Sequence, residues 1–581
     1  MKRKQTFFKA VAAMVMAFGA FSTNAQTNLG ADCGCPTVGS RPSINMSSLP
    51  GYVALDANGG ELTSGATLTC ANTYILDKKV YIPSGQTIFI EPGALIKGNT
   101  GTAINATALV ITRGGKIIAN GTESCPIVFT AAADPMDGSY GINNIGQWGG
   151  LVILGTASNN MTFAANGPFQ AGTGNGRLAI ADGLGVLEGF ASDIPQHRFG
   201  IMQNNNNPVA GESVGTFNDN ENSGVLRYVS LRHTGANLVV GNELNGLTLG
   251  SVGRGTTIEH VEIVSCADDN IELFGGTVNL KWITTIFGND DMLDWDLGWT
   301  GNCQFFFGMK SDLTMSPDSD NGIEADSDDQ RSNNTPRSHP VVYNATFVGN
   351  PKTPGTVDNS ALAGINAKEL TEGEIYNSIF ANFRNGLNLT KSLSGTRSFA
   401  AGGEAWHNWT NIAGPASATN GNGSQSLKVV CNTFVGVTNP LTNNATGASA
   451  GTAITSGPDF TQFDVTDMND IVAGNTLPGF DYTFAVNTAT NVFTQQNDVV
   501  PNPALGITGC PVSSNGFFEF APYRGAFSSV PGENWLSDWT YSAVLNSTRG
   551  VAACTTDLNK DGSTDVSDFL IFAPAFGTTC D

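Results

Sequence analysis

An acidic pattern that recurs along the middle of the chain restricts its possible folds more than any other feature. It occurs in residues 266–274, 288–296, 320–325 and, more weakly, 384–389. The first two segments align without a gap at an offset of 22 residues, and the full alignment puts Glu272, Asp294, Glu324 and Asn388 at one position. A unit of this length, repeated with insertions, is typical of a solenoid in which each unit forms one coil. We therefore predict that these four residues lie one above another on successive coils.

Short runs of residues with high β propensity precede the repeats. They comprise residues 79–82, 87–90, 94–96, 108–112, 116–119 and 126–130. Turn sequences such as Pro83-Ser84-Gly85 and Glu91-Pro92-Gly93 separate them, and helical periodicity is almost absent. Runs this short fit either a β-sandwich or a solenoid, and the repeated acidic position favours the solenoid. The predicted fold class is all-β.

Five segments along the chain carry a second signal. They are residues 147–155 (Gln-Trp-Gly-Gly-Leu-Val-Ile-Leu-Gly), 223–233, 268–276, 524–527 (Arg-Gly-Ala-Phe) and 533–535 (Glu-Asn-Trp). These segments resemble signatures of exported right-handed parallel β-helix (pectin-lyase-like) bacterial proteins, over roughly residues 50–545. The resemblance implies a right-handed parallel β-helix, the fold that pectate lyases and polygalacturonases share. It implies no particular activity, because one fold can host many functions.

The N-terminus has the features of a secretory signal peptide. Basic residues at positions 2, 3, 4 and 9 precede an apolar run over residues 10–21, and Thr23-Asn24-Ala25 follows with compact residues. The apolar run is too short to span a bilayer, which disfavours an uncleaved anchor, and no later segment is apolar enough to cross a membrane. We expect a signal peptide at 1–25, a lead-in at 26–49, a β-helix at 50–548 and a small module at 549–581. The product would be secreted to the cell surface or the medium, with the periplasm as an alternative.

All ten cysteines follow the expected cleavage site. An even number of cysteines in an exported chain favours disulfides over metal sites. Cys554 and Cys580 bracket the C-terminal module, and a bridge between them would stabilise a segment too small to form a core of its own. The Cys33-Gly34-Cys35 sequence has no second Cys or His pair, so disulfides or free thiols are expected there.

The C-terminal module contains a calcium-loop pattern. Oxygen ligands occupy loop positions 1, 3, 5, 9 and 12, the carbonyl of Ser563 would serve at position 7, and Gly562 at position 6 permits the sharp turn. The predicted metal ligands are Asp557, Asn559, Asp561, Ser563, Asp565 and Asp568. The loop and the short helix expected after it resemble one half of a type I dockerin, which implies Ca²⁺ and a cohesin-like partner. A dockerin has two such repeats and this chain has one; an acidic tail without calcium is the alternative.

The acidic column poses an electrostatic problem. Stacked strands lie about 4.8 Å apart, so Glu272, Asp294 and Glu324 would place like charges close together, at a cost of about 3 kcal/mol per neighbouring pair at an effective dielectric constant of 20. Such a column needs a cation, a shared proton or splayed side chains. A second acidic row is expected one corner away, formed by Asp268, Asp269, Asp290, Asp291 and Asp320.

Three hypotheses account for this column. The carboxylates could bind structural calcium, since hard oxygen ligands on adjacent coils would hold the coils together. Alternatively Glu272, Asp294 and Glu324 could be catalytic, because carboxylates about 5 Å apart suit retaining glycoside hydrolysis, and Lys281 or Arg232 could assist a lyase reaction. The third hypothesis is that they are solvated turn residues. The aromatic residues nearby (Trp282, Trp295, Trp299 and residues 305–307) are expected to pack mainly in the interior rather than against sugar rings.

Composition excludes several functional classes. The formal net charge of −22 disfavours nucleic acid as a partner, since phosphates are repelled by an acidic surface. Metalloprotease, serine-esterase and nucleotide-binding motifs do not occur in the sequence. We therefore expect a secreted, calcium-stabilised β-helix that binds a polysaccharide or a cell-surface component. The alternative is a polysaccharide-degrading enzyme, a lyase or a glycoside hydrolase, that uses the stacked acidic residues.

Overall fold

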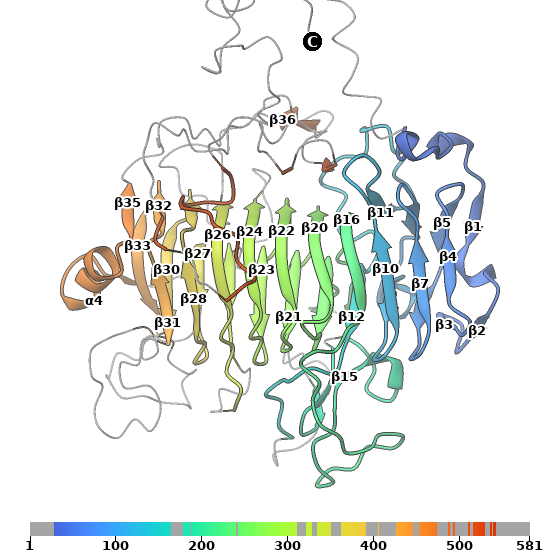
Figure 1. The fold of residues 1–581 in the computed structure, drawn as a ribbon, viewed down its shortest axis with the longest axis horizontal. Coiled ribbons are helices and arrows are strands. Elements are labelled where there is room, and N and C mark those ends of the chain that lie inside the picture. Colours follow the sequence, from blue (N-terminus) through green and yellow to red (C-terminus); the bar gives the residue numbers. More distant parts are fainter. Residues whose placement is uncertain are drawn as a thin grey trace, which may run out of the picture.

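The structure is a computed structural model in which the chain folds into a stack of parallel β-coils. It describes residues 28–163, 178–187, 189–239, 242–310, 321–327, 334–349, 362–390, 405, 409, 426–444, 452–472, 486–487, 492–493, 509–511, 515–528, 535–536 and 539–541. Figure 1 shows the coils side by side, from the N-terminal end in blue to the C-terminal end in orange.

Two sheets, of 17 and 13 strands, run the length of the stack. The 17-stranded sheet consists of β1 (Ser43–Asn45), β4 (Ala66–Leu68), β5 (Thr73–Leu76), β7 (Thr87–Ile90), β8 (Leu95–Gly98), β10 (Lys116–Asn120), β11 (Ile127–Ala131), β16 (Gly224–Arg232), β20 (Thr257–Val264), β22 (Asn279–Ile286), β24 (Asn302–Met309), β26 (Val341–Val348), β28 (Gly373–Tyr376), β29 (Ile379–Ala381), β31 (Leu427–Val430), β32 (Thr433–Val435) and β35 (Asp470–Val472). The 13-stranded sheet consists of β2 (Tyr52–Ala54), β3 (Gly59–Leu62), β6 (Lys79–Ile82), β9 (Leu109–Ile111), β12 (Leu151–Leu154), β19 (Leu247–Gly250), β21 (Ile271–Phe274), β23 (Leu293–Asp296), β25 (Ile323–Ala325), β27 (Ala363–Ala367), β30 (Asn385–Thr390), β33 (Asn439–Asn444) and β34 (Thr452–Ala453).

Nearly all pairings in these sheets are parallel and join strands of successive coils, as in β16–β20, β20–β22 and β21–β23. This arrangement confirms the predicted parallel β-helix. Expected strands at 79–82 and 87–90 coincide with β6 and β7. The turn glycines Gly85 and Gly93 have φ values of 80° and 76°, a conformation that glycine adopts without strain.

The core lies inside the coils, where aliphatic and aromatic side chains of both sheets meet. Its most regular part is a stack of phenylalanines on successive coils: Phe306, Phe347, Phe380, Phe434 and Phe463. Neighbouring ring centroids in this stack are 5.0–5.3 Å apart. A ring on each coil fills the space between the sheets and aligns with the ring above it, so the core is continuous from coil to coil.

The long strands of the 17-stranded sheet bend midway at a residue with positive φ. These residues include Tyr228, His260, Trp282 and Phe305, with φ values between 51° and 59°. At the bend the chain reverses which side chains face inward, and the four rings stack outside the coil at centroid distances of 4.4, 4.6 and 6.0 Å. Of the expected interior aromatic residues, Trp295, Trp299 and Phe306 are in the core, whereas Trp282 is half-buried on the outside.

An insertion between β12 and β16 covers part of the outer face of the 13-stranded sheet. It contains the small antiparallel strands β13 (Leu178–Ala181), β14 (Leu184–Val186) and β15 (Arg198–Gly200), and a shorter loop between β16 and β19 contains β17 (Asn237–Val239) and β18 (Asn242–Glu243). Apolar residues of the insertion, such as Val186 and Phe199, pack with Val152 and Phe274 of the sheet. Along these coils, the outer face of the 13-stranded sheet is therefore buried beneath the insertion.

The remaining elements are short. They are 3-10 helices at Ala31–Cys33, Val38–Ser40, Met46–Ser48, Ala103–Asn105 and Pro195–His197, the α-helix α4 (Pro458–Thr461), a π-helical turn at Gln462–Thr466, and the antiparallel pair β36 (Val486–Asn487) and β37 (Val492–Phe493).

A C-terminal strap, defined as the described residues between 509 and 541, runs back along the outside of the 17-stranded sheet. The disulfide Cys431–Cys510 joins its start to a late coil. Further along, the backbone N–H of Tyr541 donates to Glu262 Oε2 of β20 at 2.8 Å. Between these points, Ala526, Phe527 and other strap residues cover an apolar outer patch that includes Ile286. The strap thus contacts coils from β35 back to β16.

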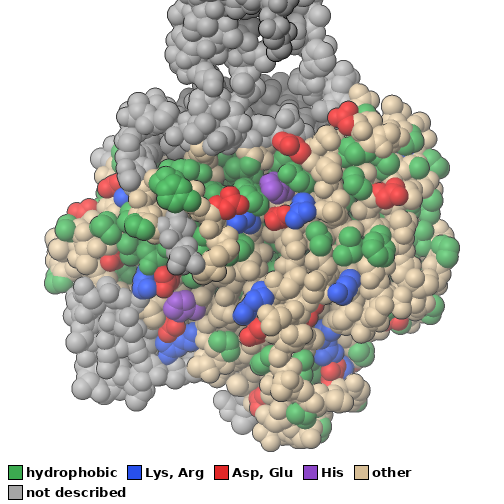
Figure 2. All heavy atoms as spheres, viewed as in Figure 1, with side chains coloured by type: hydrophobic (Ala, Val, Ile, Leu, Met, Phe, Trp, Pro, Cys, Tyr) green, Lys and Arg blue, Asp and Glu red, His purple; other side chains and the backbone are tan. Residues whose placement is uncertain are grey.

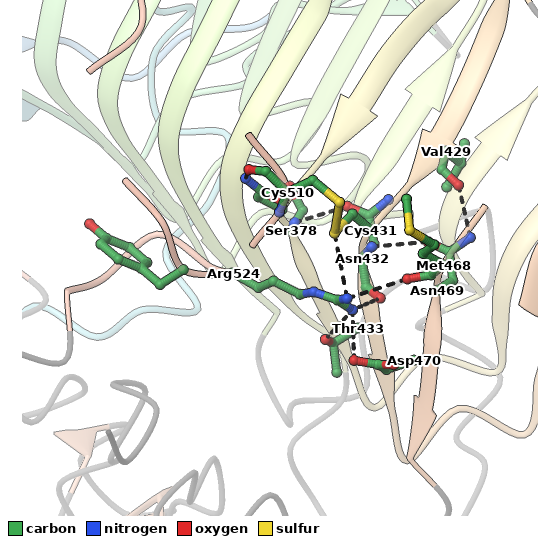
Figure 3. Close-up of a disulfide and its surroundings, with 12 residues drawn as sticks. Ser378, Val429, Cys431, Asn432, Thr433, Met468, Asn469, Asp470, Cys510 and Arg524 are labelled. Carbon is green, nitrogen blue, oxygen red and sulfur yellow. Dashed lines mark hydrogen bonds and ion pairs between the residues drawn. A yellow bond between two sulfur atoms is a disulfide. The ribbon is translucent and has the colours of Figure 1, made fainter. Parts of the chain in front are cut away.

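Arg524 fastens the strap to the late coils (Figure 3). Its guanidinium donates to the carbonyl of Asn432 and, at 3.1 Å, to Thr433 Oγ1, and it lies 2.9 Å from Asp470 Oδ2. The side chain is buried, so one arginine satisfies acceptors from two neighbouring coils. The family-like sequence at 524–527 therefore has a structural role in attaching the strap.

Three disulfides occur among the described residues: Cys33–Cys125, Cys35–Cys70 and Cys431–Cys510. Cys266 and Cys303 are buried free thiols. The first two bridges tie the segment before β1 to the first coils, and β1 itself pairs with β5. The expected signal peptide at 1–25, the Cys554–Cys580 bridge and the module at 549–581 lie outside the described residues.

Candidate functional site

The acidic residues aligned in the sequence are neighbours in the structure. Glu272 of β21 pairs in register with Asp294 of β23, and Asp294 pairs with Glu324 of β25. The column continues through Asn366 of β27 to Asn388 of β30. The sequence therefore predicted the vertical order correctly, although its alignment omitted the coil of Asn366.

These side chains point away from the coil interior, because their strand neighbours Ile271 and Leu273 are in the core. They are nevertheless shielded from solvent: Glu272 is 5% exposed and Asp294 is 3% exposed. The side chain of Glu324, with 17% exposure, is partly accessible. A polymer in solution could not reach the first two carboxylates in this conformation.

Amide side chains extend the column at both ends. Asn245 Nδ2 donates to Glu272 Oε2 at 2.5 Å, and Asn366 Nδ2 donates to Glu324 Oε1 at 3.0 Å. Asn388 Nδ2 then donates to Asn366 Oδ1 at 2.9 Å. The carboxylates thus lie within a hydrogen-bonded ladder that links successive coils, which is how buried polar groups are normally satisfied.

Lys368 neutralises part of the column. Its Nζ lies 3.0 Å from Glu324 Oε2 and 3.1 Å from Asp326 Oδ2. Burial alone would lower the pKa of Lys368, but the carboxylates of Asp326, Glu324 and Asp294 hold that pKa well above its ordinary value. The ammonium therefore stays charged and acts as a built-in cation for these acids.

The second acidic row lies at the corner before β21 and β23. Asp269 Oδ1 accepts the backbone N–H of Asp291 at 2.9 Å, and Asp291 Oδ1 accepts the backbone N–H of Asn321 at 2.6 Å. Burial raises the pKa of both carboxyls well above the ordinary value, and neighbouring carboxylates raise it further, with Lys310 partly offsetting the effect on Asp291. These aspartates cap the next coil, and Asp320 of the expected row lies outside the described residues.

Three groups of carboxylates come close enough together to hold a metal ion. Each group has one ligand oxygen per residue, and the oxygens lie within 4.8 Å of one another. The groups are Asp268–Asp269–Asp290, Asp269–Glu272–Asp294 and Asp294–Glu324–Asp326. Two oxygens bound to one calcium ion at about 2.4 Å can be no more than about 4.8 Å apart, so the spacing fits such an ion.

Lys281 and Arg232, the expected basic partners, do not join this column. Lys281 belongs to β22 in the other sheet, where its Nζ donates to the carbonyl of Phe517 at 2.7 Å and lies 3.2 Å from Glu519 Oε1. Arg232, in β16 of the same sheet, stacks on the ring of Tyr541 at 4.4 Å. Each repeat contributes a strand to both sheets. The alignment of the repeats therefore did not show that Lys281 and Arg232 lie in a different sheet from the acidic column.

Figure 2 shows hydrophobic and charged side chains on the outer face of the 17-stranded sheet. Red and blue side chains lie side by side on this face, with two histidines among them. Tyr228, His260 and Trp282 are half-buried there, next to the ion pair between Arg227 and Glu259. Farther along, Tyr343 stacks on Tyr376 at 4.9 Å and contacts Phe518 of the strap at 4.8 Å. Phe520 is 86% exposed.

A network of ion pairs borders this face. Glu372 lies 3.0 Å from Arg337 Nη1 and 3.1 Å from His339 Nδ1, while Glu374 lies 2.7 Å from Lys428 Nζ. Hydrogen bonds to Glu372 and Glu374 raise the pKa of His339 to about 9, and the same histidine lowers the pKa of Glu374 to about 2. Opposite charges are therefore matched locally on a chain that is acidic overall.

Sequence reasoning missed Lys368, Asp326 and the strap. Asp326 occupies the position two residues after Glu324, as Asp296 does after Asp294, so a longer alignment of the repeats indicates it. Lys368 stands two residues after Asn366, a coil that the alignment did not include. No local pattern indicates the strap, because its contacts join residues more than 50 apart in sequence, such as Arg524 and Asp470. The predicted calcium ligands Asp557, Asn559, Asp561, Ser563, Asp565 and Asp568 lie outside the described residues.

Comparison with known proteins identifies one family. A family model described as a pectate-lyase-like beta helix domain matches residues 60–182 and 198–462, which together make up more than half of the chain. No curated protein and no solved structure matches the chain. Across the described residues, no helix is long and apolar enough to cross a membrane.

Proposed function

The chain belongs to the pectate-lyase-like beta helix family, and from this we propose that it is a secreted, calcium-stabilised protein that binds polysaccharide at the cell surface or outside the cell. Membership supports a role in binding or degrading polysaccharide. Three disulfides among the described residues are consistent with an oxidising compartment. A signal peptide at 1–25 would direct the chain there.

Burial of the acidic column is the observation that favours binding over catalysis. Glu272 and Asp294 are almost fully covered, and Lys368 is paired with Glu324 and Asp326. Buried, hydrogen-bonded carboxylates that link coils suit a structural role, whereas a catalytic carboxylate must contact the glycosidic oxygen or the anomeric carbon of its substrate.

The outer face of the 17-stranded sheet is the proposed binding surface. Tyr228, His260 and Trp282 repeat from coil to coil, and Phe520 projects from the strap with 86% exposure. Aromatic side chains offer apolar area to sugar rings at low entropic cost, and the flanking charged groups can donate and accept hydrogen bonds. A face that repeats along one axis suits an extended polymer.

A neutral polysaccharide is the expected ligand. The chain carries a net charge of −22, so an anionic polymer such as a polyuronate would be repelled over most of the surface. The ion pairs Arg227–Glu259 and Lys281–Glu519 leave the binding face locally balanced. Charge thus disfavours the acidic polysaccharides that are substrates of pectate lyases.

A sedimentation experiment with a panel of insoluble polysaccharides, with and without EDTA, tests the proposal. We expect the protein to sediment with a neutral polymer and to release neither reducing ends nor unsaturated products. Trp282→Ala combined with Phe520→Ala should weaken binding about tenfold or more, since each stacked ring contributes about 1 kcal/mol. Ile104→Ala removes a 68% exposed apolar side chain from the 3-10 helix Ala103–Asn105, outside the proposed binding face, and should have no effect. Catalytic release of products would refute the binding role.

Degradation of polysaccharide is the second candidate function, and the spacing of the carboxylates favours it. Ligand oxygens of Asp294 and Glu324 lie within 4.8 Å, close to the separation of about 5 Å in retaining glycoside hydrolases. Glu324 is the most accessible member of the column. If products appear in the experiment above, Glu324→Gln should abolish their release while leaving sedimentation intact.

The C-terminal module is proposed to bind calcium through Asp557, Asn559, Asp561, Ser563, Asp565 and Asp568. Its resemblance to half of a dockerin supports a cohesin-like partner, which would attach the β-helix to another surface protein.

A further inference from the structure

Two of the carboxylate groups in the column share Asp294 but differ in their surroundings. In the group Asp294–Glu324–Asp326, the ammonium of Lys368 lies 3.0 and 3.1 Å from two of the acids. In the group Asp269–Glu272–Asp294, the charged side chains that act on Asp269 are all carboxylates: Asp268, Asp290, Asp291 and Asp294. The chain therefore supplies a cation to one group, whereas the charges that act on Asp269 of the other group are those of acids.

Neutral oxygen donors stand beside the second group. Asn245 is 4% exposed, its Nδ2 donates to Glu272 Oε2, and its Oδ1 has no hydrogen-bond partner. Thr248 is 1% exposed and pairs in register with Glu272, and its Oγ1 also has no hydrogen-bond partner. A buried oxygen without a partner costs about 1–3 kcal/mol. A bound cation would satisfy both oxygens.

We propose that Asp269, Glu272 and Asp294 bind one calcium ion, with Asn245 and Thr248 as additional oxygen ligands. This inference deepens the calcium-stabilised part of the proposed function and assigns a site other than the C-terminal loop. Five hard oxygen ligands, three of them carboxylates, suit Ca²⁺ rather than zinc, which prefers nitrogen and sulfur. The ligands come from the coils of β19, β21 and β23, so the ion would hold three coils together. Because the ligands are buried, the ion would not contact a substrate.

The role of Lys368 follows from the shared residue. Its ammonium occupies the neighbouring group, where a second divalent ion would otherwise bind at Asp294, Glu324 and Asp326. The column would then hold a calcium ion at one carboxylate group and the ammonium of Lys368 at the next. Removing the lysine charge should convert the second group into a further calcium site.

Calcium titration of the full chain by calorimetry, after treatment with EGTA, tests this proposal. The background variant carries Asp557→Ala and Asp561→Ala, which removes the C-terminal loop as a site. We expect one calcium ion per chain to remain bound. Asp269→Asn or Glu272→Gln should weaken its binding about tenfold or more, since affinity follows the number of charged ligands. Glu91→Gln, which removes an exposed carboxylate from the turn after β7, is the control and should leave calcium binding unchanged.

Two gain-of-function variants keep the test decisive if a loss variant unfolds. Asn245→Asp adds a charged ligand and should tighten binding about tenfold. Lys368→Gln should raise the stoichiometry from one ion to two. The site is refuted if the background variant binds no calcium, or if Asp269→Asn and Glu272→Gln bind it as the background does. Stoichiometry that stays at one in Lys368→Gln would refute the role of the lysine.

Polysaccharide sedimentation with the same variants separates this inference from the proposed function. Asp269→Asn should lose calcium and still bind the polymer, because the ligands lie on a different sheet from the binding face. A chain that binds calcium but no polysaccharide would refute the proposed function and leave the calcium site standing.

Discussion

At the scale of single residues, the stack places like charges at a short, fixed spacing and compensates them in different ways. Lys368 neutralises Glu324 and Asp326, whereas Asp269 and Asp291 accept backbone N–H groups of the next coil. Asn366 and Asn388 continue the column with neutral side chains. Parallel pairing forces each residue to meet its counterpart one coil away, so a charge on one coil constrains the residue on the next.

His339 should make stability fall as pH rises from about 6.5 to 9. Glu372 and Glu374 raise its folded-state pKa to about 9, so the folded chain binds more protons than the unfolded chain in this window. The stabilisation is complete below pH 6.5 and is lost as pH rises through 9. The difference in melting temperature between the wild type and His339→Gln should therefore be largest near pH 6 and small at pH 10.

His260→Gln provides a control with the opposite sign. Burial, followed by the charge of Arg227, lowers the pKa of His260 to about 4, so the wild type should lose stability relative to this variant as pH falls from 6.5 to 4. An equal pH dependence for the two variants would contradict the assignment of His339.

At the scale of elements, the inner phenylalanine stack should be a major source of stability. Phe380 is fully buried, with Phe347 and Phe434 at centroid distances of 5.3 Å on either side. Phe380→Ala would leave a cavity between two rings and should lower the free energy of unfolding by about 3–5 kcal/mol. Phe89→Ala, at a site 49% exposed, should cost about 1 kcal/mol or less. Denaturant unfolding measures both, and equal effects would contradict the role of the stack.

Arg524 should control how firmly the strap is attached. Arg524→Ala removes the cation beside Asp470 and leaves the buried acceptors of Asn432 and Thr433 unsatisfied, at a cost of about 2–3 kcal/mol. Hydrogen exchange should accelerate at residues 523–528 while exchange in β10 is unchanged. Arg254→Ala, 51% exposed and 4.0 Å from Asp219, should change little. Unaltered exchange in the strap of Arg524→Ala would contradict this role.

The sequence allowed the coil order to be predicted but not what covers the coils. Strands β6 and β7 and the register of Glu272 with Asp294 follow from local pattern and spacing. The alternation of side chains along a strand predicts which residues point out of the coil. It does not predict which other segment of the chain packs on those residues. The insertion that covers Phe274, the placement of Lys281 and the pairing of Cys431 with Cys510 all depend on contacts between distant segments.

At the scale of the whole molecule, calcium should act on stability through mass action. A ligand that binds the folded chain stabilises it by an amount that grows with the logarithm of its concentration. We expect EGTA to lower the melting temperature of the wild type, and added calcium to restore it. Part of this response should persist in the variant Asp557→Ala with Asp561→Ala, because the acidic column remains. A melting temperature independent of calcium would contradict calcium stabilisation at both sites.

A linear stack whose coils touch only their neighbours can unravel from an end, one coil at a time. In this protein the strap leaves the last coils at Cys510 and reaches back to Glu262 of β20. The terminal coils therefore cannot peel away until the strap has detached from the middle of the stack. Unfolding that starts at this end would therefore require many coils to open together, and we expect the chain to unfold more slowly than its equilibrium stability alone would predict.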